Sequence, residues 1–355
     1  MGAVKTEVRF VNNLYQALND YVHKVQREIG ATAAAVYLIK NDVVVNEWYS
    51  GRHGADTTFR AVDAHTQFNV ASIRKTYLGL AVSLLMEEGL IHSIDDEVGK
   101  YLTELTGTAA EGVTLRHLLT HTHGLVESEG QLQREFDPGM GWAYRNVGIR
   151  MLTRLVAQLS GQTLSSFMKD RVFNPYGLQE TGWRTEYADE LIYNYYTDPN
   201  SPAGPNDSDA GDQSNLFVSA RDLARWGHIH LRKGQLNGDQ LVPARVFERL
   251  TEMQTPESVP MSEPRNGYIW WLQHATPRNQ LGERLPDGSS LILGVTGCAC
   301  IVVPKYNAVI VRMYNQLSNP EGYHYLEDIR TFGNLAADLL RARTIFSARA
   351  GCGVM

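Results

Sequence analysis

Alternation between apolar and polar residues divides the chain into helical and sheet-forming stretches. Across residues 6–29 the apolar residues recur every three or four positions, which is the spacing of one stripe on an amphipathic helix. Residues 33–51 hold two β-branched apolar runs on either side of Asn41 and Asp42, a pattern that predicts a hairpin with its turn at these two residues. The chain is therefore expected to open with a helix followed by sheet.

A longer helical stretch follows, from about residue 72 to residue 231. Its segments include TLRHLLTHTHGL, NVGIRMLTRLVAQLSG and SARDLARWGHIHLRKG. In the last of these, Ser219 is suited to cap a helix start with Asp222 at the third helical position, and Gly234 is suited to end the helix. Residues 199–215 are dense in turn-forming residues, so we expect a long surface loop there.

The sheet pattern returns from Gly267 onward. It is carried by GYIWWLQHA, SSLILGVTGCACIVV and NAVIVRMYN, with a turn at residues 304–307 between the last two. A closing amphipathic helix is predicted by an apolar stripe formed by Ile329, Phe332, Leu335, Leu339 and Leu340.

This order of elements predicts an α+β fold in which one discontinuous sheet domain carries a mostly helical one. The expected boundaries are residues 1–71 and 235–345 for the sheet domain, with its flanking N- and C-terminal helices. Residues 72–234 would form the helical domain and residues 346–355 a tail.

Composition limits the classes of partner. The 355 residues carry 33 lysines and arginines against 39 aspartates and glutamates, a net charge of -6, which argues against nucleic acid or an acidic membrane as a general partner. No apolar run approaches the roughly 20 residues that cross a bilayer, and the N-terminus lacks the apolar core of a signal peptide. The chain as given is therefore expected to be cytoplasmic, or exported if a signal peptide has been removed. Three cysteines cannot form a disulfide framework, and the oligomeric state stays open.

Ser72 and Lys75 stand three residues apart at the head of a long apolar run. In a helix that begins near Ser72 the two share a face, so the lysine amine can reach the serine hydroxyl. A serine hydroxyl is a weak nucleophile until a neighbour takes its proton, and a desolvated lysine is one group that can do so. The alternative is a helix N-cap with a surface lysine. The same spacing recurs at Ser166 and Lys169, where we expect a solvated helix face.

Two further motifs bear on this choice. Tyr144 begins YRN, the only Y-x-N in the chain, and Val295 begins VTGC on a predicted strand near its end. The ordered triplet resembles the serine β-lactamase and penicillin-binding-protein superfamily, whose signatures include S-x-x-K, a polar second motif and K-T-G. The resemblance is closest to the branch of class C β-lactamases, esterases and D-aminopeptidases. The phrases LLTHTHGL, SARDLARWG and GYIWWL are similar to that branch as well, so the resemblance spans about residues 33–315.

The resemblance implies an antiparallel sheet flanked by helices plus a helical domain, with the site in the cleft between them. Ser72 would be the nucleophile that is acylated, Lys75 its hydrogen-bonded partner, and Tyr144 a general base and then acid. Asn146 would orient the lysine and the substrate amide, and the backbone N–H groups of Ser72 and Cys298 would form the oxyanion hole. Whether Lys75 or Tyr144 takes the first proton stays open, because closely coupled groups titrate together.

The third motif departs from the family pattern at its first position. Val295 stands where lysine or histidine is usual, before Thr296 and Gly297, so the cation that holds a substrate carboxylate and helps to lower the tyrosine pKa is missing. Arg145 or Arg74 could replace it, and Arg145 is expected to contact substrate together with the third motif. An ester or amide without a carboxylate beside the scissile bond needs no such cation.

The preferred function is therefore a serine hydrolase that cleaves an ester or amide of a small molecule or peptide through an acyl-enzyme on Ser72. No metal or organic cofactor is expected. One alternative is a β-lactamase or penicillin-binding DD-peptidase, and another is a catalytically weak binding or sensor protein of the same fold.

Two other arrangements were possible from residue types alone. The spacing of His117, His121 and His123 is compatible with zinc ligation, but no H-E-x-x-H pattern accompanies it, and the family phrase gives these residues a structural role. Cys298 is a possible nucleophile, but no partner histidine is visible, so we expect a small buried side chain.

Overall fold

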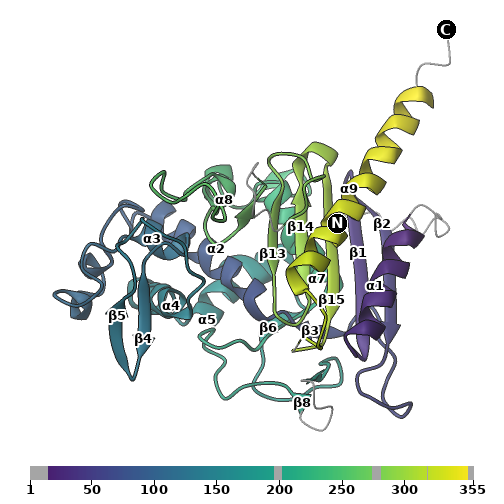
Figure 1. Cartoon of the computed structure of the whole chain (residues 1–355), viewed down its shortest axis with the longest axis horizontal. Coiled ribbons are helices and arrows are strands. Elements are labelled where there is room, and N and C mark those ends of the chain that lie inside the picture. Colours follow the sequence, from purple (N-terminus) through teal and green to yellow (C-terminus); the bar gives the residue numbers. More distant parts are fainter. Residues whose placement is uncertain (1–14, 196–201, 274–280, 318, 351–355) are drawn as a thin grey trace.

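The structure, a computed structural model, describes residues 15–195, 202–273, 281–317 and 319–350. Within these residues a six-stranded sheet forms the centre of the molecule, and each pair of neighbouring strands runs antiparallel (Figure 1). The predicted antiparallel sheet of an α+β fold is confirmed. In spatial order the strands are β12 (Trp271–Leu272), β13 (Ser290–Leu293), β14 (Ala299–Val303), β15 (Ala308–Tyr314), β1 (Ala33–Lys40) and β2 (Val43–Gly51).

The strands β1 and β2 form the predicted hairpin. Its turn residues Asn41 and Asp42 have φ angles of 51° and 64°, a left-handed conformation that asparagine and aspartate tolerate better than most side chains. β1 is buried along its whole length because β2 and β15 flank it and helices pack on both of its faces.

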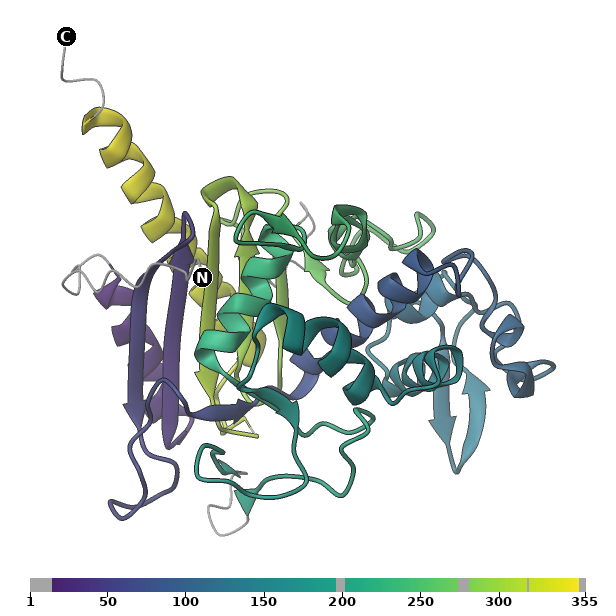
Figure 2. The ribbon, with the colours of Figure 1, turned by 180° about the vertical axis from the view of Figure 1, so that it is seen from behind.

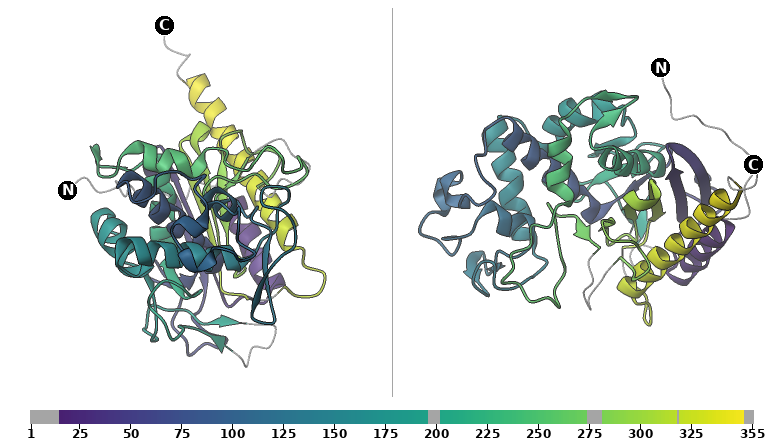
Figure 3. Two further views of the ribbon diagram at one scale, coloured as in Figure 1. Left: turned by 90° about the vertical axis from the view of Figure 1, so that its left-hand side faces the viewer. Right: turned by 90° about the horizontal axis from the view of Figure 1, so that it is seen from above.

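Helices cover both faces of the sheet. α1 (Gln16–Glu28) and α9 (Tyr325–Ala350) lie beside each other on one face, and α7 (Ala220–Leu231) lies on the other (Figures 2 and 3). The predicted cap of α7 is confirmed, because Ser219 Oγ accepts a hydrogen bond of 3.0 Å from the Asp222 N–H. A Cβ on Gly227 would lie 2.5 Å from the Val309 side chain, so glycine is what allows α7 to approach the sheet this closely.

A buried ion pair fixes α9 to the sheet. Arg312 of β15 donates to Asp328 of α9 at 2.5 Å, and both side chains are shielded from solvent. Tyr21 of α1 and Tyr323 each donate to the same carboxylate at 2.6 Å. With several donors around it, the buried carboxylate is stabilised as an anion and holds two helices and a strand together.

The remaining helices lie mainly beside the sheet. All of them except α8 (Ala244–Thr251), which falls within the predicted sheet domain, lie in the region predicted to be helical. α2 is buried on nearly all sides because it packs against other helices there and not on solvent, and its near-continuous apolar sequence fits that position. The predicted boundaries at residues 72 and 234 stay a prediction, but α7, which lies between them, packs on the sheet. These helices are α2 (Arg74–Glu87), α3 (Leu115–Leu119), α4 (Asn146–Ser160), α5 (Leu164–Met168), α6 (Asn174–Tyr176) and α8 (Ala244–Thr251).

Short elements complete the described chain. A three-stranded sheet has the order β3 (Gln67–Asn69), β9 (Leu216–Ser219) and β6 (Thr181–Trp183). The two-stranded pairs are β4 (Leu125–Ser128) with β5 (Gln131–Arg134), β7 (Asn194–Tyr195) with β8 (Pro202–Ala203), and β10 (Gln235–Leu236) with β11 (Asp239–Gln240). The short helical turns are η1 (Ala71–Ile73), η2 (Val98–Lys100), η3 (Thr103–Leu105), the π-helical η4 (Lys169–Phe173) and η5 (Pro304–Tyr306). β8 lies inside the predicted surface loop of residues 199–215.

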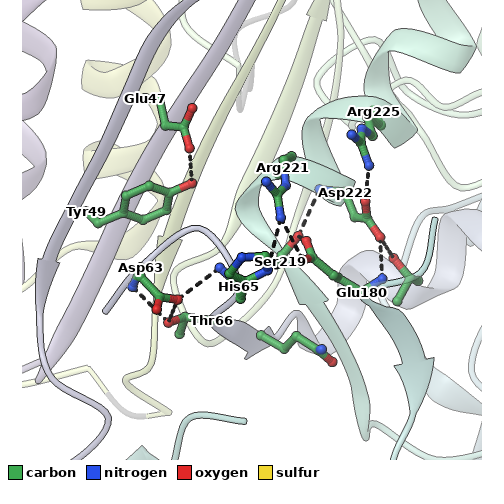
Figure 4. Close-up of polar contacts among 12 residues, drawn as sticks. Glu47, Tyr49, Asp63, His65, Thr66, Glu180, Ser219, Arg221, Asp222 and Arg225 are labelled. Carbon is green, nitrogen blue, oxygen red and sulfur yellow. Dashed lines mark hydrogen bonds and ion pairs between the residues drawn. The ribbon is translucent and has the colours of Figure 1, made fainter. Parts of the chain in front are cut away.

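A polar cluster joins the three-stranded sheet to α7 (Figure 4). The Glu180 carboxylate accepts hydrogen bonds of 2.7 Å from Ser219 Oγ and Arg221 Nη2 and pairs with His65 Nδ1 at 2.7 Å. Burial raises the pKa of Glu180, but these three partners together hold it below its usual value. We call these four residues the Glu180 cluster.

One sequence-based prediction about the C-terminal third is wrong. Residues 289–303, predicted as one strand, form β13 and β14 joined by a tight turn, so VTGC lies in the turn and not on a strand. The turn closes through a 2.9 Å hydrogen bond from Gly294 N to Cys298 O, and Gly297 supplies the φ of 85° that it needs. The division of the chain that assigns a tail from residue 346 stays a prediction, and α9 continues as far as Ala350.

Two predictions extend past the described residues. The opening helix was predicted from residue 6, and the part before residue 15 lies outside them, as does the tail beyond Ala350. Within the described part of the chain, no helix combines the length and the apolar character that crossing a membrane requires.

Candidate active site

Ser72 lies in a tight turn between a strand and a helix. β3 ends at Asn69, η1 carries the serine, and α2 begins at Arg74. Ala71 adopts a φ of 47°, which is strained for a residue with a Cβ. Asn69 stabilises this conformation, since its side chain accepts a 2.8 Å hydrogen bond from Ala71 N and its carbonyl accepts one from Thr296 at 2.8 Å. The turn presents the Ser72 hydroxyl to the cavity described below.

Lys75 links the two hydroxyl groups of the site. One helical turn after Ser72, its Nζ donates to Ser72 Oγ at 3.1 Å and to Tyr144 Oη at 2.7 Å. Tyr144 comes from the segment that precedes α4, far away in sequence. We call Ser72, Lys75 and Tyr144 the Ser72 cluster.

The electrostatics of the cluster favour a neutral lysine. Burial and, to a lesser extent, the positive charge of Arg74 together lower the pKa of Lys75 to about 7. Burial raises the pKa of Tyr144, while its hydrogen bond with Ser72 and the charge of Arg74 oppose that rise. No carboxylate of the described chain forms an ion pair with Lys75, so near neutral pH a large fraction of its amine can accept a proton.

The Ser72 cluster borders a cavity of about 650 Å³. Aromatic and aliphatic side chains form most of its wall, and Trp142, Tyr144 and Trp271 lie against one another with ring centroids 5.3 to 6.3 Å apart. Such a wall suits an apolar group of a substrate. The lining residues are Ser72, Trp142, Tyr144, Glu263, Pro264, Trp271, Leu293, Val295, Tyr325, Leu326 and Arg330.

The third motif reaches the cavity through one side chain. Val295 lines it and is 49% exposed. The Thr296 hydroxyl points instead to the Asn69 carbonyl, and the buried Cys298 thiol bonds to the Tyr314 carbonyl at 3.3 Å. Gly297 provides the turn. Burial raises the pKa of Cys298 to about 11, so its thiol is not an activated nucleophile, as expected.

Asn146 and Arg145 do not line the cavity. Asn146 is the first residue of α4, and its exposed side chain bonds to neither Lys75 nor Ser72. Arg145 forms a two-pronged ion pair with Glu135, at 3.1 Å from Nε and 2.8 Å from Nη2. An arginine whose donors are used in this way does not supply the cation that Val295 lacks.

Arg74 and His121 lie behind the cluster. Arg74 is buried with its Nε 3.3 Å from Ser214 Oγ, and it acts on Lys75 and Tyr144 only through its charge. The His121 ring packs on Tyr144 with centroids 4.6 Å apart, and its two buried nitrogens have no hydrogen-bond partner. Burial holds the pKa of His121 well below its usual value, so the ring is a neutral support for Tyr144.

The other two histidines of this segment serve as local caps. His117 Nδ1 accepts from Thr114 N at 3.2 Å, and His123 Nδ1 accepts from Leu125 N at 2.9 Å. The described residues contain no group of three or more histidine, cysteine or acidic side chains placed to hold a metal ion. The second S-x-x-K, Ser166 and Lys169, is exposed on the surface, as predicted.

Sequence reasoning missed several lining residues. Trp142 stands two positions before Tyr144, and a search around the Y-x-N motif could have found it. Leu293, Tyr325 and Arg330 carry no local signal, because only the folding of the β13–β14 hairpin and of α9 brings them to Ser72.

Comparison with known proteins shows the family of the chain. The sequence matches the family described as Beta-lactamase over residues 16–331, so the chain belongs to this family of serine hydrolases. It is 40% identical over 331 residues to an uncharacterized protein of Alkalihalophilus pseudofirmus, covering 92% of this chain and 96% of that one.

Two solved structures show the same fold. A class C β-lactamase in complex with cefoxitin superposes with a TM-score of 0.75 at 16% identity, over 94% of this chain and 99% of the other. EstCE1, described as a hydrolase with promiscuous acyltransferase activity, gives a TM-score of 0.72 at 19% identity, over 91% and 99% of the two chains. The predicted β-lactamase/transpeptidase-like fold is confirmed.

Proposed function

We propose that the protein hydrolyses an ester or amide through an acyl-enzyme intermediate on Ser72. The observation that carries the proposal is the position of Lys75, whose amine bonds to both the Ser72 and Tyr144 hydroxyls and has a pKa of about 7. A neutral amine at this place can take the serine proton as the hydroxyl attacks the substrate carbonyl.

The proton then has a short route to the leaving group. Tyr144 shares its hydroxyl with Lys75 and lines the cavity, so the Lys75–Tyr144 pair can hold the serine proton and return it to the departing oxygen or nitrogen. Deacylation uses the same pair in reverse, because a water molecule must lose a proton to attack the acyl-enzyme. An orienting role for Asn146 stays a prediction, since its side chain contacts neither member of the pair.

For the oxyanion hole, the pairing of the Ser72 and Cys298 N–H groups stays a prediction, and we propose the N–H group of Leu293 as a second partner of Ser72. Gly294 N donates across the hairpin to Cys298 O, on the side of β14. Ser289 O accepts from Gln273 N on the other side, toward β12. Because successive residues of a strand point their N–H groups to opposite sides, Leu293 directs its own away from β14. β12 pairs only with Ser290 and Leu291, so beyond its end Leu293 faces the cavity that Ser72 also lines.

The cavity supports an ester or amide substrate over a β-lactam. Val295 leaves the third-motif position without a charge, and neither Arg145 nor Arg74 lines the cavity in its place. A substrate whose carboxylate adjoins the scissile bond therefore lacks a partner there.

Covalent labelling tests the proposal. The protein is treated with a fluorophosphonate and, separately, with penicillin, and intact mass is measured for the wild type, Ser72→Ala and Ser166→Ala. Ser166→Ala is a matched control, because it removes the serine of the second, exposed S-x-x-K. We expect a fluorophosphonate adduct on the wild type and Ser166→Ala and none on Ser72→Ala.

Other outcomes favour the alternatives. A lasting penicillin adduct on Ser72 would favour a penicillin-binding enzyme. Rapid penicillin turnover that exceeds turnover of simple esters would favour a β-lactamase. Absence of any Ser72 adduct and of ester hydrolysis would contradict the proposal and favour a binding or sensor protein.

A further inference from the structure

Arg330 is the basic residue of the described cavity wall. It lies in the second turn of α9 and lines the same cavity as Ser72. A second hollow of about 730 Å³ adjoins at this point, since Arg330, Tyr325 and Leu326 line both. A ligand that extends from Ser72 along the aromatic wall therefore meets a guanidinium.

The guanidinium of Arg330 is unpaired within the described chain. Among the described residues, its buried Nε has no hydrogen-bond partner, and no carboxylate forms an ion pair with it. Arg312 and Arg145 differ from it in this respect, because each is paired with an acid. A buried donor with no partner is costly and is usually satisfied by a protein group, a water or a ligand.

Three acids lie in the surroundings of Arg330, namely Glu263, Glu283 and Glu327. Glu283 borders the adjoining hollow, where its carboxylate accepts a 3.1 Å hydrogen bond from Asn334, and the Arg330 charge helps to lower its pKa from a distance. Glu263 lines the main cavity. Glu327 borders the adjoining hollow as well. None of these three acids forms an ion pair with Arg330, so its donors remain available to an incoming anion.

We propose that Arg330 binds a carboxylate of the substrate, and that the substrate is an ester or amide with an apolar body and a carboxylate remote from the scissile bond. This inference rests on the proposed function for the reacting bond. The aromatic wall accommodates the apolar body, while a guanidinium in such surroundings forms charge-assisted, two-pronged hydrogen bonds with a carboxylate. The uncharged Val295 argues only against a carboxylate next to the reacting carbonyl. It is therefore compatible with a carboxylate that binds at Arg330.

Equilibrium binding to the full-length Ser72→Ala variant tests this without any turnover. The probes are 4-phenylbutyrate and its uncharged amide, which share size and ring but differ in charge. Binding is followed by tryptophan fluorescence, to which Trp142 and Trp271 in the cavity wall contribute. We expect the acid to bind about 10-fold more tightly than the amide, as for one charge-assisted pair in partly dry surroundings.

Variants then assign the preference to one side chain. Arg330→Gln is expected to remove the preference for the acid and to leave the affinity for the amide within about twofold. Arg330→Lys should keep part of the preference, because lysine keeps the positive charge but lacks the paired N–H donors of a guanidinium. Arg284→Gln is the matched control. This exposed arginine of the same region pairs with Asp338 and lines neither hollow, so the preference should persist.

Several results would overturn the inference. The first is that Ser72→Ala shows no preference for the acid, or binds neither probe. The second is that the preference for the acid survives Arg330→Gln. The third is that Arg284→Gln loses the preference as fully as Arg330→Gln does. Melting temperatures of all variants check that each is folded. Failure of Ser72 labelling together with an Arg330-dependent preference would reject the hydrolase and keep the carboxylate site, so the two proposals fail separately.

Discussion

The Ser72 cluster and the Glu180 cluster each join a serine hydroxyl to titratable side chains, but they differ in how completely the charged group is paired. In the Glu180 cluster one carboxylate meets an arginine, a histidine and a hydroxyl, and its pKa falls below the usual value (Figure 4). In the Ser72 cluster a buried amine meets two hydroxyls and no carboxylate of the described chain, and its pKa falls to about 7. The first arrangement stabilises a charge, and the second destabilises one.

The difference separates a structural role from a chemical one. A carboxylate surrounded by donors gains little by changing its protonation state, so the Glu180 cluster holds β3, β9 and α7 in place. An amine denied a counter-ion is ready to exchange protons near neutral pH. Incomplete pairing, more than the kinds of residue present, therefore marks the reactive cluster.

Lys75→Met should produce the largest effect. We expect kcat/KM for an ester to fall by about 10³-fold or more, because the base for Ser72 is lost. The melting temperature should stay level or rise. The pKa of Lys75 is lower in the folded state than in the unfolded chain, so below about pH 10 the unfolded chain binds the proton more readily. Lys75 therefore lowers the stability of the folded protein at neutral pH, and methionine removes that penalty. Steady-state kinetics and thermal unfolding measure the two effects, and a variant that keeps more than a tenth of the activity would contradict the assignment.

Glu180→Gln should show the opposite pattern. We expect the free energy of unfolding to fall by about 2 kcal/mol, because three donors lose an anionic acceptor in partly buried surroundings. Activity per folded molecule should stay within twofold. The folded-state pKa of Glu180 is depressed, so its contribution is present above the unfolded pKa and the gap between variant and wild type should narrow as the solution becomes acidic.

Glu127→Gln is the control for the Glu180 variant in chemical denaturation. Its carboxylate pairs with Arg150 on the surface, where both side chains are about half exposed, so a loss below about 1 kcal/mol is expected. A Glu180 variant that is no less stable than this control would show that complete pairing does not mark a structural cluster.

The sequence predicts the parts of this comparison that depend on local spacing. Ser72 and Lys75 meet because three residues make nearly one turn of α2, and the hairpin at Asn41 and the cap at Ser219 follow from equally short-range rules. The α+β order of helices and sheet is also predictable, because periodicity changes between segments.

The rest depends on packing between distant segments. VTGC forms a turn because Gly297 supplies the positive φ that the turn needs, although the apolar residues around it are typical of a continuous strand. The unpaired state of Arg330 follows from where α9 lies, and no sequence pattern distinguishes it from the paired Arg312. Pairing is a property of the fold, so the most informative difference between the two clusters was not available from the sequence.

The pH dependence of activity should report the unpaired amine directly. Protonated Lys75 cannot accept the serine proton, so kcat/KM should rise with pH through a midpoint near 7 and fall about tenfold for each unit below it. The midpoint belongs to the Lys75–Tyr144 pair jointly. Rates from pH 5 to 9 measure it, and Glu180→Gln should leave it unmoved. A profile that is flat across this range would mean that the cluster does not titrate as proposed.

Arg145→Gln should have the smallest effect, although Arg145 is the sequence neighbour of Tyr144. Its guanidinium is paired with Glu135 and lies outside the cavity. Like the carboxylate of Glu180, it is therefore a charge that already has its partner. The Arg145 side chain is 45% exposed, so loss of the ion pair should lower the free energy of unfolding by less than about 1 kcal/mol. We expect kcat/KM to change by less than about twofold for neutral and carboxylate-bearing esters alike, in steady-state assays of both. A selective loss for the acidic ester would place the substrate cation at Arg145 and remove the reason for assigning it to Arg330.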